Sequence, residues 1–356
     1  MIDFLIIGGG IAGVSAAARL SALDSVTLLE REDGLAYHAS GRSAALFEQN
    51  YGKPSTVALN TASRDFHFEA NVLSDRGLML VGRREQAEEF NRNRHDMQLE
   101  PITVEQAQAK WPILDESRIT MAAFDPHAWD IDTDRLVQTF ARMARENGSH
   151  IKTKSQVTAI RRIPQGWEVK TKADIYLARN IVNAAGAWGD LIAGMAGIKK
   201  IGFTPMRRSM ARIPAPDGHD LRRWPMVVGP GEDWYSKPDA GALIVSPGEE
   251  QPMEPHDAYA DDMVLAEGIA RFSENVTIEV TRLLSSWAGL RTFAPDRTLV
   301  LGPDPADSTF IWCAGQGGYG MQSSPAASQL LADLISGRTP CISKSAVEEL
   351  SPTRFA

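Results

Sequence analysis

A glycine-rich turn close to the N-terminus has the residue types and spacing that bind phosphate. Gly8, Gly10 and Gly13 form a G-x-G-x-x-G pattern, with Ile11 and Ala12 before the last glycine. The first glycine of such a pattern allows a tight turn, the second lets a pyrophosphate approach the backbone, and the third lets a helix touch a strand. The N-terminus of the following helix carries partial positive charge. The spacing therefore predicts a dinucleotide site.

The segments around this turn have the order that a dinucleotide site requires. An apolar strand is predicted over 4–7, a helix of small residues over 14–20 and a second strand over 26–29. Glu30 follows that strand, where a carboxylate can accept hydrogen bonds from an adenosine ribose. Because strand, turn, helix, strand and acid occur in order, the pattern is more specific than a glycine motif alone.

Two arginines are candidates for binding a carboxylate. Arg208 follows Pro205, Met206 and Arg207, and Arg291 ends the segment 287–291. A guanidinium fork can bind both oxygens of a carboxylate at once. A surface or interdomain ion pair is the alternative for each arginine.

Two further segments favour FAD over NAD as the dinucleotide. Residues 31–45 are polar and small where a nicotinamide enzyme would normally continue into a helix, and the hydroxyls of Ser40 and Ser43 could hold a second phosphate. A solvated loop is the alternative for this segment. Residues 310–314 predict a buried strand, followed by a glycine-rich turn and a helix over 325–335. The positive N-terminus of that helix would stabilise an anionic reduced flavin.

Taken together, these segments resemble the FAD-dependent D-amino-acid oxidase superfamily and, within it, the bacterial D-amino-acid dehydrogenases, most closely D-arginine dehydrogenase. The resemblance covers nearly the whole chain and is carried by residues 41–45, 130–134, 183–188, 207–209, 235–241, 287–291 and 316–320. It implies oxidation of a D-amino acid by hydride transfer from Cα to flavin N5, followed by hydrolysis of the imino acid to a 2-oxo acid and ammonia.

The glycine motifs and the resemblance together predict the residues that contact FAD. They are Gly8, Gly10, Ile11, Ala12, Gly13, Glu30, Arg31, Ser40, Gly41, Arg42, Ser43, Ala44, Val157, Ala185, Gly186, Trp188, Arg291, Gly317, Gly318, Tyr319, Gly320, Met321 and Gln322. The resemblance implies that the backbone of Val157 meets the adenine and that Gln322 lies beside the flavin. Some relatives attach the flavin through cysteine or histidine. We predict non-covalent FAD, since Cys313 lies inside a predicted strand and Cys341 follows the last predicted helix.

The resemblance also assigns roles around the substrate. Arg208 and Arg291 would bind the substrate carboxylate, Tyr235 would contact the substrate, and Tyr51 would belong to a mobile lid. The carbonyl of Gly318 would receive the substrate amine. From the residues alone, each tyrosine is more often a packed aromatic. No side chain of this set is an obvious general base, so we expect the rate to rise with pH through an amine-like pKa.

Two departures from D-arginine dehydrogenase bear on the substrate. Leu78 replaces the glutamate that pairs with the substrate guanidinium, while Leu46 and Glu48 replace a histidine and a threonine near the lid. An unpaired buried cation is very costly. Unless Glu48 takes the anchoring role, we expect D-Arg to be a poor substrate and apolar, uncharged or cyclic D-amino acids to be preferred.

The positions of the motifs predict an α/β fold of two interleaved domains. A Rossmann-like FAD-binding domain is predicted from residues 1–75, 148–200 and 280–356, and an α+β substrate domain from 76–147 and 201–279. Short apolar runs over 112–130 and 205–245, broken by Pro and Gly, predict an antiparallel sheet in the substrate domain. A helix is predicted over 134–147, and a hairpin over 156–171 in the FAD-binding domain.

Composition limits the possible classes of function. The chain has 37 basic and 45 acidic residues and a formal net charge of -8, so it lacks the electrostatic footprint of a nucleic-acid binder. Two cysteines argue against a disulfide framework and fit a reducing compartment. The uncharged stretch 4–18 is too short for a membrane span and too rich in glycine for a signal peptide. We expect a cytoplasmic protein, free or peripheral to the membrane, with no metal site.

Partners and alternative functions stay open at this point. The expected partners are a small amino-acid substrate and an electron acceptor, either a quinone or oxygen. The oligomeric state is undetermined. A 2-hydroxyacid oxidoreductase, or one that acts on secondary amines of the glycine, sarcosine or proline type, would use the same arginines and flavin. An NAD(P)-dependent dehydrogenase and a flavoprotein subunit that binds a partner chain are two further alternatives.

Overall fold

The glycine turn joins a strand to a helix in the computed structural model, which describes all residues from 1 to 356. Strand β1 (Ile2–Ile7) leads through the turn into α1 (Ile11–Leu20) and then into β2 (Val26–Leu29). Strand β1 pairs in parallel with β2 and with β12 (Ile175–Asn183). All four residues of β2 are buried, as expected for a strand covered on both faces.

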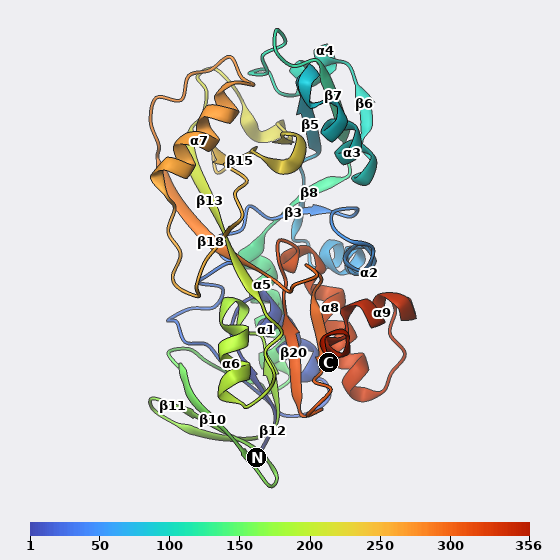
Figure 1. Ribbon diagram of the computed structural model, residues 1–356, viewed down its shortest axis with the longest axis vertical. Helices are drawn as coiled ribbons and strands as arrows, with labels where there is room; N and C mark the ends of the chain where they lie inside the picture. The colour runs from blue at the N-terminus through green and yellow to red at the C-terminus, as the bar shows by residue number, and fades with distance from the viewer.

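These strands belong to an eight-stranded sheet, seen in the lower half of Figure 1. Its path runs β10-β11-β12-β1-β2-β9, and β20 pairs with both β12 and β19. The other bounds are β9 His150–Lys152, β10 Val157–Ile163, β11 Gly166–Thr171, β19 Val300–Pro303 and β20 Phe310–Ala314. The predicted hairpin is therefore β10–β11, and segments far apart in the chain meet in one sheet.

The two faces of this sheet pack against different layers. Phe4 and Ile6 of β1 belong to a core shared with α1, α2 (Pro54–Glu69), α5 (Thr133–Glu146) and α8 (Gly320–Ser336). Leu5 and Ile7 belong to a second core shared with the hairpin and α6 (Gly189–Met195). Successive residues of a strand point to opposite faces, so the uninterrupted apolar run of β1 serves both cores.

Helix α8 differs from its prediction. It begins at Gly320 and contains Pro325, whereas the sequence predicts a start at Pro325. A proline removes one backbone donor and is usually excluded from a helix interior. Side chains of α2 take over hydrogen bonds at this position, as described below, and this compensation allows the helix to start earlier.

Helix α5 forms where it is predicted but packs in an unexpected place. The side chain of Asp132 caps it by accepting a hydrogen bond from the Arg135 N–H at 2.9 Å. Its apolar face, which includes Leu136 and Phe140, packs on the core of the dinucleotide sheet next to α1. The predicted range 76–147 assigns α5 to the substrate domain, and its packing does not match that assignment.

A second sheet of nine strands forms the upper half of the molecule. Its path runs β17-β13-β16-β15-β14-β5-β7-β6, with β18 on β13, and β5 and β14 are its one parallel pair. The bounds are β5 Leu78–Gly82, β6 Glu100–Ile102, β7 Met121–Asp125, β13 Thr204–Pro214, β14 Met226–Val228, β15 Tyr235–Asp239, β16 Ala242–Ser246, β17 Gln251–Pro252 and β18 Ser285–Phe293. The prediction of an antiparallel sheet is thus largely confirmed. Strand β18 belongs to it, although 280–356 is predicted within the FAD-binding domain.

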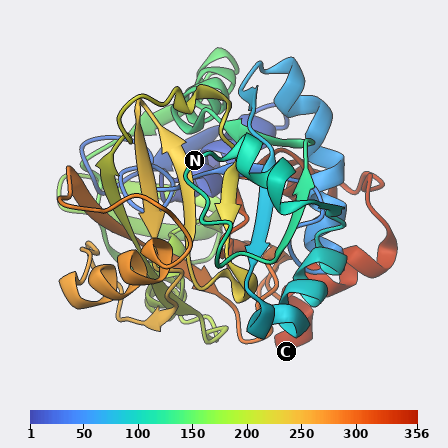
Figure 2. The same ribbon diagram turned by 90° about the horizontal axis from the view of Figure 1, so that it is seen from above.

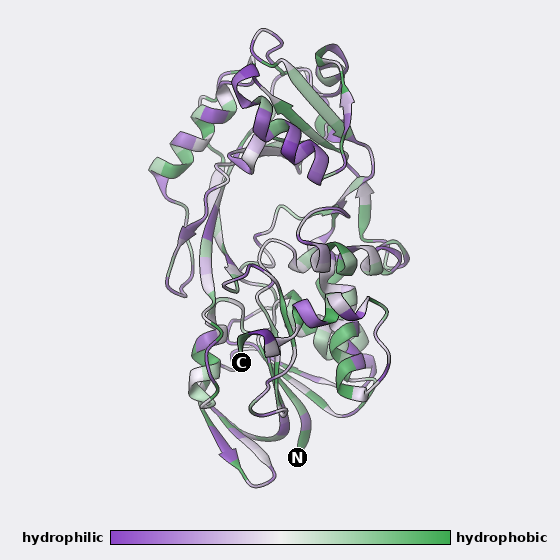
Figure 3. Cartoon of the chain, turned by 45° about the vertical axis from the view of Figure 1, so that its right-hand side comes forward, coloured by the Kyte–Doolittle hydropathy of each residue, from purple (hydrophilic) through white to green (hydrophobic).

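Shorter helices surround this upper sheet. They are α3 (Ala87–Asp96), α4 (Val104–Lys110) and α7 (Asp262–Ser273), while α9 (Lys344–Leu350) follows α8. Figure 2 shows α7, in orange, and α2, in light blue, on opposite sides of the molecule. Figure 3 shows hydrophobic residues, in green, along strands in both halves of the molecule. None of the helices has the length and apolarity needed to cross a membrane.

A small three-stranded sheet lies between the two larger sheets in Figure 1. It consists of β3 (Leu46–Glu48), β4 (Leu73–Asp75) and β8 (Ala128–Ile131). Phe47 packs in the core between the eight-stranded sheet and helices α1, α2, α5 and α8. Leu46 packs instead with Leu78, Met210 and Tyr235 of the nine-stranded sheet. Strand alternation therefore places Glu48 on the same side as Leu46.

Candidate active site

The three glycines of the N-terminal turn have the roles that their spacing predicts. Gly8 has φ +111°, and a Cβ on it would lie 2.4 Å from the carbonyl oxygen of Ala184. A Cβ on Gly13 would lie 1.8 Å from the carbonyl oxygen of Gly8, so only glycine lets α1 approach the turn. Gly10 lines both cavities described below, and a Cβ on it would lie 3.2 Å from the hydroxyl oxygen of Ser40.

Glu30 holds the turn in place. Its two carboxylate oxygens accept hydrogen bonds from the backbone N–H groups of Gly9, at 2.6 Å, and Glu32, at 2.8 Å. The side chain is 7% exposed and lines the adjacent cavity. The carboxylate therefore organises the backbone first, and its remaining lone pairs face the position expected for a ribose.

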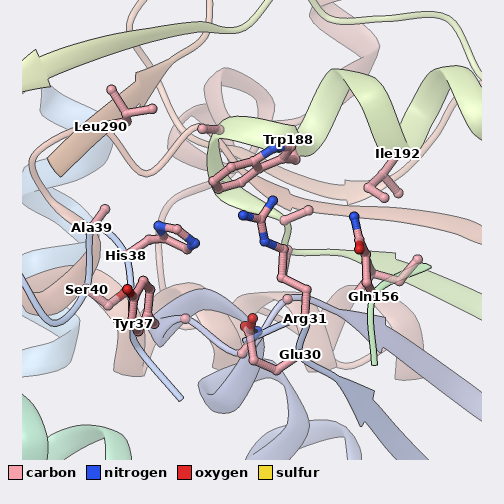
Figure 4. A pocket seen from close by; sticks show the side chains of 18 of the residues that line it. Glu30, Arg31, Tyr37, His38, Ala39, Ser40, Gln156, Trp188, Ile192 and Leu290 are labelled. Carbon is pink, nitrogen blue, oxygen red and sulfur yellow. Dashed lines mark hydrogen bonds between the residues drawn. The ribbon is translucent and has the colours of Figure 1, made fainter. Parts of the chain in front are cut away.

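A cavity of about 370 Å³ opens beside this turn. Figure 4 shows Arg31 and Trp188 facing each other inside it, and the guanidinium carbon lies 4.2 Å from the indole ring centre. The ring of His38 lies 4.9 Å from that of Trp188. Val157 and Ile192 contribute apolar surface to the wall of this cavity. Flat aromatic and guanidinium surfaces of this kind can hold a planar adenine.

A second cavity of about 130 Å³ continues from the first. Both are lined by Gly10, Ser40, Arg42, Ala184 and Gly289, so together they form one elongated space. The space runs from Glu30, past the N-terminus of α1, to Arg291. This shape fits an extended dinucleotide, with its pyrophosphate at the glycine turn and its flavin ring beside Arg291.

Most residues predicted to contact FAD line this space. Those that do not are Gly13, Gly41, Ala44, Tyr319 and Gln322, and Tyr51 and Tyr235 of the predicted substrate site are also outside the linings. Other lining residues were not predicted from the sequence, namely Ile7, Gly9, Leu29, Ala36, Tyr37, His38, Ala39, Ser155, Gln156, Ala184, Ala187, Leu191, Ile192, Met195, Met210, His256, Ala258, Gly289, Leu290, Thr292 and Gln316. Most of these are ordinary apolar or small residues, which carry no local signal of function.

The segment 36–45 is held by hydrogen bonds in which two serine hydroxyls accept, so each hydroxyl keeps its own hydrogen to donate to a phosphate. The hydroxyl of Ser40 accepts the Ile11 N–H at 3.0 Å, and that of Ser43 accepts the Ala45 N–H at 3.1 Å. Arg42 connects this segment to residues of the half of the molecule that contains the nine-stranded sheet. Its guanidinium donates to the carbonyls of Ala258 and Ala288 at 2.9 and 3.0 Å, and to the carboxylate of Asp257 at 2.6 Å.

Replacing Arg42 with methionine is expected to weaken retention of FAD about tenfold. Arg42 lines both cavities, and its contacts hold this part of their wall in place. The ion pair with Asp257 contributes only about 1 kcal/mol, because Asp257 is about half exposed and solvent screens the pair. Loss of the two carbonyl contacts adds to this effect. The rate of FAD release after dilution, followed by flavin fluorescence, measures it. Arg142→Met, at an exposed site on α5, is the control. Equal release rates for Arg42→Met and wild type would show that the contacts of Arg42 do not help to retain FAD.

The two candidate arginines lie on neighbouring strands at the end of the second cavity. Arg208 of β13 is opposite Gly289 of β18, and Met206 is opposite Arg291, so both guanidiniums leave the same face of the sheet. Arg208 is 4% exposed, donates to the carbonyl of Glu249 at 3.0 Å and forms an ion pair with Glu250, whose carboxylate lies 3.6 Å from Nη2, while its buried Nη1 has no hydrogen-bond partner. A buried donor without a partner is rare and favours a missing anionic ligand.

Arg291 lies against the second glycine turn. A Cβ on Gly318 would lie 3.1 Å from its Nη1, so the absence of a side chain there makes room for the guanidinium. Burial by itself lowers the pKa of Arg291, but Tyr51, Tyr235, Glu232 and Glu250 outweigh burial and raise it. Arg291 is therefore a permanent cation at the end of the cavity.

Two tyrosines approach these arginines from different elements. Tyr51 donates a hydrogen bond to the carboxylate of Glu232 at 3.0 Å, and its ring lies 5.2 Å from that of Tyr319. Burial, and then the charge of Glu232, raise the pKa of Tyr51. Tyr235 is 2% exposed, and its hydroxyl has no partner. The hydrogen bond between Tyr51 and Glu232 therefore joins the predicted lid loop to the half of the molecule that contains the nine-stranded sheet.

The first turn of α8 presents Met321 and Gln322 toward this region. Gln322 is 3% exposed, and its side-chain oxygen accepts the Glu48 N–H at 3.1 Å. Its buried Nε2 has no partner. Gln322 does not line the second cavity, whereas Arg208 does, and the orphaned donor of Arg208 together with the glycine turn and the elongated space fits an FAD group and a substrate anion.

Glu48 is a buried acid that the sequence analysis marks only as a departure. One carboxylate oxygen accepts the Asn50 N–H at 2.9 Å, and the other has no partner. Burial raises the pKa of Glu48 to about 7, against the lowering effect of Asn50, and nearby Asp125 raises it further.

Glu48→Gln is expected to change how the free energy of unfolding depends on pH. The folded pKa of Glu48 lies above its usual value of 4.5, so the folded state binds more protons between the two values. Wild-type stability therefore falls as pH rises through this window and levels off above about pH 7. Glutamine stays neutral, so the variant should gain about 2 to 3 kcal/mol relative to wild type between about pH 5 and about pH 8.

Urea unfolding of both proteins at the two pH values measures this gain. Glu69→Gln, at the exposed end of α2, is the matched control. Taking the difference between variant and wild type removes contributions from His67 and other groups. A difference that does not change with pH would show that Glu48 is ionised at little cost in the folded protein.

The structure bears on flavin attachment and metals as well. Cys313 is buried, and burial raises the pKa of its thiol to about 12, so the reactive thiolate is suppressed. Cys341 is exposed and follows α8. No group of three or more His, Cys, Asp or Glu side chains is close enough to hold a metal ion.

Comparison with known proteins identifies the family. The model of the DAO family, described as FAD dependent oxidoreductase, matches residues 3–334. FAD-dependent oxidoreductase domain-containing protein 1 from Bos taurus is 26% identical, over 94% of this chain and 81% of that protein. Mitochondrial dimethylglycine dehydrogenase from Rattus norvegicus is 24% identical, over 99% of this chain but only 45% of that protein, so this chain spans under half of that relative.

Solved structures agree with the family match. The crystal structure of L-proline dehydrogenase from P. horikoshii has a TM-score of 0.85 and 26% sequence identity to this chain. The match covers 99% of this chain and 97% of that chain. Since the family model spans most of the residues and the elongated cavity fits the cofactor, the chain belongs to the DAO family of FAD-dependent oxidoreductases, with FAD as its cofactor.

Proposed function

We propose that this protein oxidises the carbon–nitrogen bond of a small α-amino acid whose nitrogen is secondary or N-alkylated. The observation that carries the proposal is the pair of guanidiniums, Arg208 and Arg291, on one face of β13 and β18 at the flavin end of the cavity. Two arginines at that place suit one carboxylate of a small substrate.

The names of the relatives support an alkylated amine. The rat relative is a dimethylglycine dehydrogenase and the structural relative an L-proline dehydrogenase. Dimethylglycine has a tertiary amine and proline a cyclic secondary amine. These names favour the secondary-amine alternative over the D-amino-acid dehydrogenase expected from the sequence, and oxidation of a primary D-amino acid becomes the second outcome to test.

The chain's own residues would position the substrate for the reaction. Arg208 and Arg291 would bind the carboxylate, and the backbone carbonyl of Gly318 would accept a hydrogen bond from a substrate amine that carries an N–H. The hydrogen-bonded pair of Tyr51 and Glu232 would cover the site and exclude water. Bound FAD supplies the acceptor for the hydride from the substrate carbon. The product imine is then hydrolysed.

The apolar surroundings of the site argue against a charged side chain on the substrate. Leu78 is 4% exposed and packs in the same core as Met210 and Tyr235. A guanidinium placed there would be desolvated without a counter-charge unless Glu48, on the same side of β3 as Leu46, reached it. We therefore keep the expectation that D-Arg is a poor substrate.

Anaerobic mixing of the purified yellow protein with a substrate panel tests the proposal. The panel contains sarcosine, dimethylglycine, D- and L-proline, D-Leu, D-Arg and a 2-hydroxy acid, and loss of flavin absorbance reports reduction. Fastest bleaching by the alkylated amines supports the proposal. Fastest bleaching by D-Leu or by the hydroxy acid replaces it with one of those functions. Reoxidation by oxygen or by a quinone then identifies the electron acceptor.

A further inference from the structure

Helix α2 has a buried polar face that neither the sequence motifs nor the proposed reaction accounts for. Thr56, Asn60, Ser63 and His67 are all 0% exposed, and their spacing of four, three and four residues places them on one side of the helix. Buried polar groups in folded proteins almost always have hydrogen-bond partners. The hydroxyl of Thr56 has no partner, whereas Asn60, Ser63 and His67 have partners on α8 and on the loop that carries Tyr51.

The backbone ladder of α8 is interrupted next to its first turn. Pro325 has no N–H to donate to the carbonyl of Met321, which accepts the hydroxyl of Ser324 instead at 3.1 Å. The Ala326 N–H donates to the hydroxyl of Ser63 at 3.0 Å. Next to the first turn of α8, side chains therefore pair backbone groups that Pro325 disturbs.

Side chains of α2 form hydrogen bonds with backbone groups in and next to the first turn of α8. The Nε2 of His67 lies 2.9 Å from the carbonyl oxygen of Gln322. The hydroxyl of Ser63 donates to the carbonyl of Ser323 at 3.3 Å. The turn that carries Met321 and Gln322 is thus attached to α2 as well as to α8.

His67 is suited to be a constant donor. Burial lowers its pKa to about 4, against the raising effect of the Gln322 carbonyl, so the ring is neutral near neutral pH. Because Nε2 faces a carbonyl, we assign the proton to Nε2. The other ring nitrogen, Nδ1, is buried without a partner.

The same face also holds the loop that carries Tyr51. The Asn60 side-chain amide donates to the carbonyls of Gln49, at 3.2 Å, and Tyr51, at 3.0 Å. One helix therefore contacts both the lid loop and the first turn of α8, on two sides of the candidate active site.

We propose that His67 and Ser63 are positioning residues that hold the first turn of α8 toward the flavin ring and thereby raise the flavin reduction potential. The proposal rests on the proposed seat of the flavin at the N-terminus of α8. That terminus carries partial positive charge, which stabilises an anionic reduced flavin when the turn is held close. If the turn moves away, the reduced form loses this stabilisation.

Paired variants of the FAD-loaded protein test this role. His67→Gln places an amide nitrogen near the position of Nε2 and keeps the donor, whereas His67→Asn places it near Nδ1 and leaves the carbonyl of Gln322 unpaired. The measurement is the two-electron reduction potential by equilibration with a reference dye. We expect His67→Asn to shift the equilibrium about tenfold toward oxidised flavin, a fall of about 30 mV. His67→Gln should stay within about twofold of wild type.

Ser63→Ala and Ser63→Thr form a second pair, for use if His67→Asn does not fold. The threonine keeps the hydroxyl, so only the alanine variant should lower the potential. Thr61→Ala, on the exposed face of α2, is the control. A potential equal to wild type in His67→Asn or Ser63→Ala overturns the proposal, as does an equal fall in both members of either pair. If wild type itself binds no FAD, the assumed seat of the flavin fails instead.

Discussion

Replacing Arg291 with methionine is expected to lower kcat/KM for the carboxylate substrate by about hundredfold or more, with FAD still bound. Methionine has a similar length and no charge, so the variant removes one of the two cations that the substrate carboxylate meets. Losing one member of a buried, hydrogen-bonded charge pair costs about 2 to 5 kcal/mol, which corresponds to roughly 30- to 4000-fold. The other cation, Arg208, should keep the carboxylate weakly bound.

Lysine at the same position separates charge from shape. Arg291→Lys keeps the charge but loses the fork that binds both carboxylate oxygens, so its kcat/KM should fall between wild type and Arg291→Met. Arg282→Met, in the exposed loop before β18, is the control. Steady-state kinetics and the ratio of flavin to protein absorbance are the measurements. Full activity in Arg291→Met would exclude this residue from the substrate site.

Among substitutions that add a single methyl group, Gly13→Ala is expected to have the largest effect on folding and cofactor binding. The added Cβ would lie 1.8 Å from the carbonyl oxygen of Gly8, which is backbone and cannot rotate away. Overpacking of a well-packed core typically costs about 1 to 3 kcal/mol, and a backbone clash this short should reach the upper end or exceed it. Separation of α1 from β1 would also open the pyrophosphate site.

Urea unfolding and FAD titration of the apoprotein measure these two consequences. We expect a loss of about 3 kcal/mol in the free energy of unfolding and at least tenfold weaker FAD binding. Gly34→Ala is the matched control, because a Cβ there meets nothing within 4 Å and the backbone needs no positive φ. Unchanged stability and FAD affinity in Gly13→Ala would mean that the contact between α1 and β1 does not position the turn.

The sequence was most informative where the signal is local. The turn from β1 into α1 and the β10–β11 hairpin are encoded within short segments, and both form as predicted. Proline was misleading at Pro325, because the rule that it starts or ends a helix assumes that side chains do not satisfy the backbone groups around it. In α8, Ser324 donates to the carbonyl of Met321, while Ser63 and His67 pair the neighbouring Ala326 N–H and Gln322 carbonyl.

The candidate site was predictable to a different extent for each residue. Arg208 and Arg291 stood out because of their types and their neighbours, but only the register of β13 and β18 brings them onto one face. Arg42 was predicted as a cofactor contact, yet most of its guanidinium contacts are to the upper unit. Such partners lie more than 200 positions away, so no local pattern contains them.

The sequence by itself determined the dinucleotide motif, the kind of cofactor and the presence of two arginines for a carboxylate. These features depend on backbone freedom, charge and side-chain chemistry, which residue types carry with them. Only the tertiary structure decided that α5 joins the dinucleotide unit, that Arg291 rests on Gly318, and that α2 buries a polar face against α8. Those outcomes depend on which apolar faces bury each other and which distant groups satisfy each buried donor, and both are properties of the whole fold.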